Sequence, residues 1–431
     1  MTLEAARPIP ASSASPPLRL LRETLVTFLI SSHNRRDVLL STLHQLQQCE
    51  LSDGACETIV IDNASRDGTA AAVMEQFPQV RLLALRQNEG ACAKNLGLAH
   101  ARGQYIVFLD DDSFPAASSV ERMIRHFEAD PKLGAAVFTV TLPDGSRECS
   151  AYPTVFIGCG TGFRRGALEQ VGGLPDDFFM QAEEYDLSLR LLDAGWSIRR
   201  FDDLHVTHLK TPSARSSTRT TRLDVRNNLL LATRHFPDRW VFPFAWDWMR
   251  RYYYIAAAKG HRIAYMQGLL SGIARVMRDV RRRPVSDETF EQFARLEQTH
   301  QRMARAQRAF NLQRVLFVDL GKNILPYWKA ARACGIEIVA IADQRLAHPG
   351  RRYRGIPVLH DAAAADLEFD AAIVSNLSPV HAAARTQAWR RRDDRPVIDL
   401  FEVDEPTAFI SARRAAAESR RTAARTDTQV A

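Results

Sequence analysis

The feature that most constrains the fold is an alternation of short apolar runs and amphipathic stretches between residues 24 and 112. The order predicts strands alternating with helices, with strand candidates TLVTFLIS, ETIVID, VRLLAL and QYIVFLD. Connections of this length favour a parallel sheet covered by helices on both faces. Ligands bind such α/β domains beyond the carboxyl ends of the strands, so we expect the functional residues at that edge.

Changes in pattern divide the chain into five parts. The predicted fold is α/β: a first domain with a mostly parallel sheet, a helical extension and a small Rossmann-like domain. The expected bounds are a flexible leader over 1–22, the first α/β domain over 23–212, the helical extension over 213–310, the Rossmann-like domain over 311–405 and an Arg-rich tail over 406–431.

The first turn of the second α/β domain lacks the GxGxxG pattern of dinucleotide-binding domains. Only Gly321 is present, and Lys322 and Asn323 stand where close contact with a pyrophosphate favours glycine. A structural or partner-binding role is therefore favoured over cofactor binding for this domain.

Charge and cysteine content exclude several classes. Lys and Arg number 57 against 50 Asp and Glu, a net charge of +7 without a dense basic stripe, so no nucleic-acid partner is expected. The six cysteines show no CxxC pair and no metal-ligand spacing, which favours reduced thiols over disulfides or a zinc site. No apolar run approaches the roughly 20 residues that span a bilayer. We expect a cytoplasmic protein, either soluble or peripheral at the inner face of the plasma membrane.

Three adjacent carboxylates end the fourth predicted strand: Asp110, Asp111 and Asp112. Their mutual repulsion is costly unless a cation lies among them, and few oxygen ligands suit Mg²⁺ or Mn²⁺. Side chains alternate along an extended chain, so Asp110 and Asp112 are predicted to face one side and Asp111 the other. The alternative is a solvated acidic turn or helix cap.

Two further turns lie at the same predicted edge. Asp62 ends the second strand, where a carboxylate can accept hydrogen bonds from a base or ribose, although turn residues here also suit helix capping. The turn QNEGACAKNLG places Gly90 before Lys94 and Asn95. Close approach of the backbone to an anionic ligand explains the glycine, and so does an ordinary loop.

The motifs VTFLISSHNRR, VIDNASRDGT, QNEGACAKNLG, FLDDD and GCGTGFRRGALEQVGGLPDDFFMQAEEYDLSLRLLDAGW occur in the order found in the family 2 inverting glycosyltransferases. The resemblance covers roughly residues 24 to 212 and implies the GT-A nucleotide-sugar-binding fold. The continuation RNNLLLATRHFP is similar to the branch that includes bacterial rhamnosyltransferases.

This resemblance implies roles for the acids of the strand ends. It places Asp62 on the uracil or thymine base and Asp110 near the ribose, with Asp110, Asp112 and His208 around a divalent cation, Mn²⁺ or Mg²⁺. The other residues expected at the donor are Asn34, Asn88, Gly90, Lys94, Asn95 and Asp111.

The stretch AEEYDLSLR lies where the family keeps its catalytic acid. Inverting transfer needs one base that deprotonates the acceptor hydroxyl as it attacks C1. Glu184 matches the position that is usually Asp, and Glu183 and Asp186 are the competing candidates. The alternative is that these acids favour the start of a helix through its dipole.

Aromatic residues and arginines are interleaved between Trp240 and Tyr254. Such a segment suits a lipid headgroup interface, which fits a lipid-linked acceptor. Packing between helices and a homo-oligomer interface are the more common explanations.

We therefore expect an inverting hexosyl- or deoxyhexosyltransferase. It would use a UDP- or dTDP-sugar, a divalent cation and a saccharide or lipid-linked saccharide acceptor in cell-surface polysaccharide synthesis. One alternative is a non-catalytic sugar-nucleotide-binding scaffold. Another is a nucleotidyltransferase, which would normally carry a Gly-rich basic loop that SSHNRR does not supply.

Overall fold

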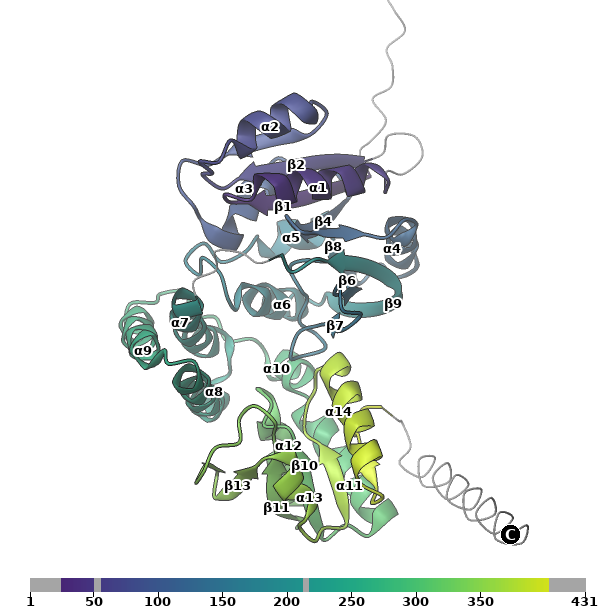
Figure 1. Cartoon of the computed structure of the whole chain (residues 1–431), viewed down its shortest axis with the longest axis vertical. Helices are drawn as coiled ribbons and strands as arrows, with labels where there is room; N and C mark the ends of the chain where they lie inside the picture. The colour runs from purple at the N-terminus through teal and green to yellow at the C-terminus, as the bar shows by residue number, and fades with distance from the viewer. Residues whose placement is uncertain (1–24, 50–55, 212–216, 403–431) are drawn as a thin grey trace, which may run out of the picture.

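The computed structural model describes residues 25–49, 56–211 and 217–402. The predicted leader and Arg-rich tail lie outside these residues. Two sheets occupy opposite ends of the molecule, and a group of helices lies between them (Figure 1).

The first half of the large sheet follows the predicted alternation. Four parallel strands lie in the order β3-β2-β1-β4. They are β1 (Val26–Ser32), β2 (Cys56–Asp62), β3 (Arg81–Ala84) and β4 (Tyr105–Asp110). The connecting helices are α1 (Arg36–Gln47), α2 (Thr69–Gln76), the 3-10 turn η1 (Gly90–Ala93) and α3 (Lys94–Leu98). The alternation expected for a parallel α/β sheet is confirmed.

Register brings the polar strand ends to one edge of this sheet. Ser32 at the end of β1 is paired with Asp62 of β2, and Ser31 is paired with Asp110 of β4. The residues before them are apolar and buried, as expected for strands covered on both faces. Burial of the apolar run therefore fixes where each strand delivers its first polar side chains.

The second half of the sheet contains antiparallel pairs and continues in the order β8-β6-β9-β5, with β7 beside β6. Its strands are β5 (Ser113–Pro115), β6 (Leu133–Thr141), β7 (Arg147–Glu148), β8 (Thr161–Arg164) and β9 (Ser197–His208). Its helices are α4 (Ser119–Ala129), α5 (Arg165–Val171) and α6 (Glu183–Asp193). Because β5 pairs with β9, Ser113 is aligned with His208, which lies beside the acid triplet.

The middle of the chain is helical, as predicted. It contains α7 (Ser217–His235), α8 (Asp238–Ala258), α9 (Arg262–Val276), α10 (Asp287–Ala294) and α11 (Leu296–Phe310). Helix α9 packs closely on α7, since a Cβ on Gly268 would lie 2.5 Å from the carbonyl oxygen of Arg222. Among the described helices, none combines the length and the apolar character needed to cross a bilayer.

The aromatic residues of α8 divide between two environments. Phe244 and Trp248 are buried, whereas Phe242 is 73% exposed and Trp246 49% exposed. Packing between helices therefore accounts for part of this segment only.

A second, smaller sheet follows the helices. Its strands lie in the order β12-β13-β11-β10-β14-β15, all parallel except β12. They are β10 (Arg314–Val318), β11 (Glu337–Ala342), β12 (Arg352–Tyr353), β13 (Ile356–Leu359), β14 (Ala371–Val374) and β15 (Val397–Ile398). Its helices are α12 (Ile324–Ala333), α13 (Asp361–Ala365) and α14 (Pro379–Arg392). The expected second α/β unit is confirmed.

Candidate active site

A cavity of about 670 Å³ lies at the carboxyl edge of the large sheet. The segments after β1, β2, β3 and β4, the loop before β8, the first turn of α6, the end of β9 and the start of α7 line it. The predicted site residues in its lining are Asn34, Asn88, Gly90, Lys94, Asp110, Asp111, Glu183, Glu184 and His208. Those outside its lining are Asp62, Asn95, Asp112 and Asp186.

The acid triplet turns a corner rather than continuing the strand. Strand β4 ends at Asp110, and Asp111 and Asp112 form a turn. The Arg35 guanidinium contacts Asp111 Oδ1 at 2.5 Å and Asp112 Oδ2 at 2.9 Å. The predicted alternation, with Asp111 opposite Asp112, is therefore wrong, because it assumed an extended chain beyond Asp110. Arg35 was not among the residues predicted from the sequence.

The two oxygens of the Asp112 carboxylate have different partners. Its Oδ2 accepts hydrogen bonds from Arg35 and from the Thr211 backbone N–H at 3.0 Å. Its Oδ1 is buried, makes no hydrogen bond within the described residues, and lies 3.3 Å from Nε2 of His208. Burial opposes the charge of Asp112, but His208 and Arg35 outweigh it and hold the pKa of this carboxyl below its usual range. An anionic oxygen therefore points at the imidazole.

His208 is oriented by an acid on its other side. Nδ1 of His208 lies 3.0 Å from Oε2 of Glu148, whose Oε1 also contacts Lys210 at 3.1 Å. Histidines that bind metals usually donate their second ring N–H to a carboxylate in this way. Glu148 gave no signal in the sequence, because its pairing depends on β7 lying beside β6.

Three potential ligand atoms converge at this point. One atom each from Asp110, Cys159 and His208 lies within 4.8 Å of the other two. A carboxylate, an imidazole, a thiol and the unsatisfied Asp112 Oδ1 suit a divalent cation. The chain therefore fits the expected metal, with Cys159 as a member that the spacing of the cysteines did not reveal.

Asp110 also contacts a basic side chain, Lys94. Nζ of Lys94 lies 3.2 Å from Oδ1 of Asp110 and 5.8 Å from the ring centre of Phe108. The lysine is buried, so its ammonium is held in the floor of the cavity. An ammonium in this position suits an anionic ligand.

Two adjacent glutamates on the first turn of α6, Glu183 and Glu184, also line the cavity. Oε1 of Glu184 accepts a hydrogen bond from the Gly158 backbone N–H at 2.7 Å. Oε2 of Glu183 is buried without a hydrogen bond within the described residues. Burial raises the pKa of both carboxyls, and repulsion from Glu183 raises the pKa of Glu184 further. A carboxylate with a raised pKa is a stronger base at neutral pH.

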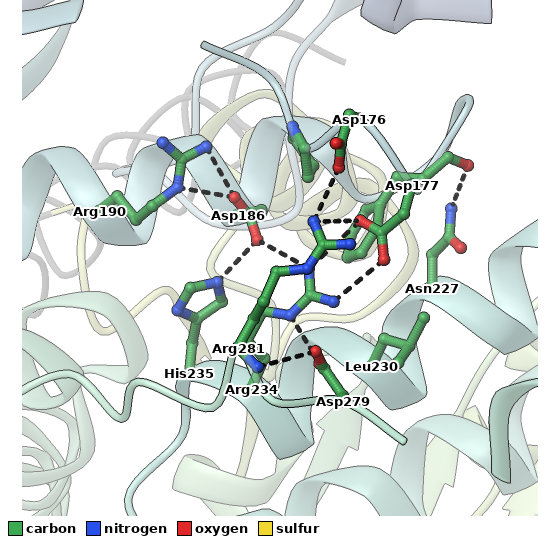
Figure 2. A network of polar contacts seen from close by, with 12 residues as sticks. Asp176, Asp177, Asp186, Arg190, Asn227, Leu230, Arg234, His235, Asp279 and Arg281 are labelled. Carbon is green, nitrogen blue, oxygen red and sulfur yellow. Dashed lines mark hydrogen bonds and ion pairs between the residues drawn. The ribbon is translucent and has the colours of Figure 1, made fainter. Parts of the chain in front are cut away.

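Asp186 does not reach the cavity, although it lies on the same helix. Its oxygens contact Arg190 Nε and His235 Nε2, each at 2.7 Å, and Arg234 at 3.8 Å (Figure 2). Burial opposes its charge, but His235 and Arg190 lower the pKa of Asp186 to about 2. The structure thus corrects the expectation that Asp186 competes as the base: it anchors α6 to α7.

The same network reaches the end of α9. Arg234 contacts Asp177 at 3.1 Å and Asp279 at 2.8 Å, and Arg281 contacts Asp176 at 2.7 Å (Figure 2). Asp176 and Asp177 precede α6 in the chain, and Asp279 and Arg281 follow α9. The helix that carries the glutamates is therefore tied to the helical region.

Several other predicted donor residues hold loops in place. Asp62 is buried and accepts a hydrogen bond from the Ser65 backbone N–H at 3.1 Å. Asn95 clamps Leu174 through the backbone N–H and C=O, each at 2.8 Å. The roles of Asp62 and Asn95 in donor binding stay predictions.

The three remaining donor residues lie on the rim of the cavity. Asn34 Oδ1 accepts a hydrogen bond from the Arg66 backbone N–H at 2.7 Å, and Asn88 Oδ1 accepts one from that of Gly90 at 2.8 Å. A Cβ on Gly90 would lie 2.1 Å from the carbonyl oxygen of Phe179. Close packing against Phe179 therefore requires this glycine.

Comparison with known proteins finds relatives of the first part of the chain. Residues 27–154 match glycosyl transferase family 2. Succinoglycan biosynthesis protein ExoO of Rhizobium meliloti is 34% identical over 107 residues, 24% of this chain and 30% of that protein. The putative teichuronic acid biosynthesis glycosyltransferase TuaG of Bacillus subtilis is 30% identical over 105 residues, 23% of this chain and 40% of that protein. The chain thus spans less than half the length of these relatives, and the matches support a family 2 glycosyltransferase.

Solved structures also align with the chain. The mannosyltransferase PcManGT from Pyrobaculum calidifontis, in complex with GDP-Man and Mn²⁺, aligns over 58% of this chain and 75% of its own, with 22% identity and a TM-score of 0.41. A TarS fragment of S. aureus covers 72% of this chain and 90% of its own, with 11% identity and a TM-score of 0.45. The strand order of the large sheet together with the family 2 match confirms the expected GT-A-like fold.

Proposed function

We propose that this chain is an inverting glycosyltransferase. It moves a hexosyl or deoxyhexosyl group from a UDP- or dTDP-sugar to a hydroxyl of a saccharide or lipid-linked saccharide in cell-surface polysaccharide synthesis. The observation that carries the proposal is that Asp110, His208 and Glu184 line one cavity. The relatives named for succinoglycan and teichuronic acid biosynthesis support the class of product.

The donor would occupy the side of the cavity formed by the segments that follow β1, β2, β3 and β4. Asn34 and Asn88 offer polar atoms there, and Lys94 offers a buried ammonium for the diphosphate. Asp110, Asp112 and His208, with Cys159 beside them, would hold the cation, Mn²⁺ or Mg²⁺. When bound, such a cation offsets the negative charge that develops on the departing nucleoside diphosphate.

Glu184 would act as the base. Its carboxylate takes the proton of the acceptor hydroxyl while the hydroxyl oxygen attacks C1 of the sugar from the face opposite the diphosphate. The Gly158 N–H holds Oε1 of Glu184, and the raised pKa of the carboxyl matches it to a proton transfer at neutral pH. The acceptor would enter beside Glu183 and the start of α7, where Arg219 and Thr220 line the cavity.

Release of nucleoside diphosphate tests this proposal. The full chain is incubated with a panel of nucleotide sugars, Mn²⁺ or Mg²⁺, and saccharide acceptors. We expect acceptor-dependent release from a UDP- or dTDP-sugar, with loss of release in EDTA. Tight nucleotide-sugar binding without turnover on any acceptor would instead support the scaffold alternative.

We also propose that α9 contacts an anionic lipid surface. Apolar side chains spaced three and four residues apart are exposed along it and just beyond it: Ile263, Met266, Leu270, Ile273, Met277 and Val280. Residues 259–283 contain seven Lys and Arg against one acid, Asp279. Three of the seven, Arg275, Arg281 and Arg282, contact acids of neighbouring segments. A second copy would bring like charges together, whereas anionic headgroups complement them.

Vesicle sedimentation of the full chain tests this surface. We expect binding to vesicles that contain an anionic phospholipid, weaker binding to neutral vesicles, and loss of binding in the double variant Ile263→Gln, Leu270→Gln. Met74→Gln is a matched control, because Met74 on α2 is as exposed as Leu270, at 62%. A stable dimer by analytical ultracentrifugation without vesicle binding would overturn the lipid proposal in favour of the oligomer interface.

A further inference from the structure

A buried thiol lies in the predicted cation site. Cys159 precedes β8 and is only 3% exposed. Its Sγ, a carboxylate oxygen of Asp110 and a ring nitrogen of His208 all lie within 4.8 Å of one another. Three different elements deliver these atoms: the end of β4, the loop before β8 and the end of β9.

The surroundings of the thiol are built for a ligand. Glu148 fixes one nitrogen of His208, so the other is directed toward Asp112, whose Oδ1 is buried and lacks a hydrogen bond within the described residues. Arg35 and the Thr211 backbone hold the second oxygen of Asp112. The imidazole and the carboxylate are therefore oriented before any ion arrives.

We propose that Cys159 is a thiolate ligand of the divalent cation and makes this site select thiophilic ions. The inference rests on the cation site of the proposed function and adds to it a ligand and a metal preference. On binding, the S–H bond breaks, a sulfur–metal bond forms and the proton passes to solvent. Thiolate and imidazole ligands suit Zn²⁺, and Co²⁺ binds such ligands more tightly than Mn²⁺, whereas oxygen ligands suit Mg²⁺ and Mn²⁺.

A second cysteine offers a matched control. Cys149 also lines the cavity, but its Sγ lies 3.0 Å from Oγ of Ser378 and 3.3 Å from the carbonyl oxygen of Ser150. It is not a member of the group formed by Asp110, Cys159 and His208. Comparing variants of Cys159 and Cys149 therefore distinguishes a thiol that binds the metal from a thiol that only lines the cavity.

Cobalt spectroscopy of the full chain tests the proposal. Titration with Co²⁺ is expected to produce a thiolate-to-cobalt charge-transfer band in the near ultraviolet. The band should persist in Cys149→Ser and vanish in both Cys159→Ser and Cys159→Ala, with circular dichroism confirming that each variant is folded. By calorimetry, Cys159→Ser should bind Zn²⁺ about 10- to 100-fold more weakly and Mg²⁺ with unchanged affinity.

The results separate this inference from the proposed function. Co²⁺ binding without a charge-transfer band, or an equal band in folded Cys159→Ser, would overturn the role of Cys159. Sugar transfer by that variant with Mg²⁺ would then still support the glycosyltransferase. Conversely, a band that depends on Cys159 in a protein that transfers no sugar would keep the thiolate ligand and reject the activity.

Discussion

The carboxyl edges of the two sheets are built on the same strand-and-helix principle but have opposite environments. At the large sheet, the edge opens into a cavity of about 670 Å³. At the second sheet, the space near the first turn is about 20 Å³, room for roughly one water. An open edge whose carboxylate oxygens lack hydrogen-bond partners can bind a ligand. An edge filled by side chains of the chain itself can only stabilise the fold.

Ion pairs fill the edge of the second sheet. Arg385 contacts Asp319 at 2.7 Å and Asp361 at 2.8 Å, and His381 contacts Asp319 at 3.0 Å. Arg385, Asp319 and Asp361 are all buried. Asp112 at the first edge also pairs with Arg35, but its Oδ1 has no hydrogen bond in the described structure.

Helix α8 closes the remainder of the second edge. The Trp248 indole donates a hydrogen bond to the carbonyl oxygen of Lys322 at 2.8 Å. Nζ of Lys322 lies 4.3 Å from the ring centre of Trp248 and 3.8 Å from that of Tyr185. Lys322 lies in the turn after β10, which corresponds to the turn that binds pyrophosphate in dinucleotide-binding domains. Here it packs on Tyr185, the residue next to Glu184, as expected for a structural role of the second domain.

The largest effect should come from the base at the open edge. Glu184→Gln keeps the shape of the side chain but cannot accept a proton, so nucleoside diphosphate release should fall about 10²- to 10⁴-fold. Glu169→Gln, on an exposed residue of α5, is the control. If Glu184→Gln releases product at the wild-type rate, Glu184 is not the base.

At the filled edge, the effect should be on stability alone. Arg385→Ala leaves the buried Asp361 without its arginine and Asp319 with His381 alone, which should lower the free energy of unfolding by about 3–5 kcal/mol. Arg390→Ala, on the same helix but in a more exposed pair with Glu402, should cost less than about 1 kcal/mol. Denaturant unfolding measures both values, and kcat/KM of the folded variants should be unchanged. A selective loss of donor affinity in Arg385→Ala would show that the second edge binds ligand.

Metal-dependent donor binding should depend on Asp112. Asp112→Asn removes the negative charge beside His208, so nucleoside diphosphate should bind about 10- to 100-fold more weakly with Mn²⁺ and with little change in EDTA. Asp37→Asn, whose side chain is 81% exposed, is the control. Calorimetry that finds equal affinities for Asp112→Asn and wild type would contradict the cation site.

The smallest expected effect is a shift in the pH profile. Because burial raises the pKa of Glu184, its basic form is lost at a higher pH than for a solvated glutamate near 4.3. The rate of turnover should therefore fall up to tenfold per unit as the pH drops through the raised pKa. Glu183→Gln removes a repelling charge and should move this acidic limb of the pH–rate profile to lower pH. A limb that stays in place would show that the two carboxyls do not interact.

The comparison also shows what the sequence could reveal. The strands from Val26 to Asp110 were predictable because their apolar runs are continuous, and register then placed Asp110 at the edge. The orientation of Asp111 could not be predicted, because it depends on where β4 ends and on the contact with Arg35. The partners of Asp186 were hidden as well, because His235 comes from a different helix.

The residues of the candidate cation site were predictable in part for the same reason. The FLDDD motif and His208 carry the family resemblance, and β5 pairing with β9 brings them together. Cys159 and Glu148 join them through contacts between elements distant in sequence, which spacing along the chain does not reveal.

The most direct measurement is a crystal structure of the full chain with Mn²⁺ and a nucleoside diphosphate, read by the anomalous signal of manganese. The account predicts the ion between Asp110, Asp112 and His208, with the diphosphate beside Lys94 and the cavity open toward Glu184. Manganese and nucleotide at the edge of the second sheet, or no nucleotide in the large cavity at saturating concentration, would contradict it.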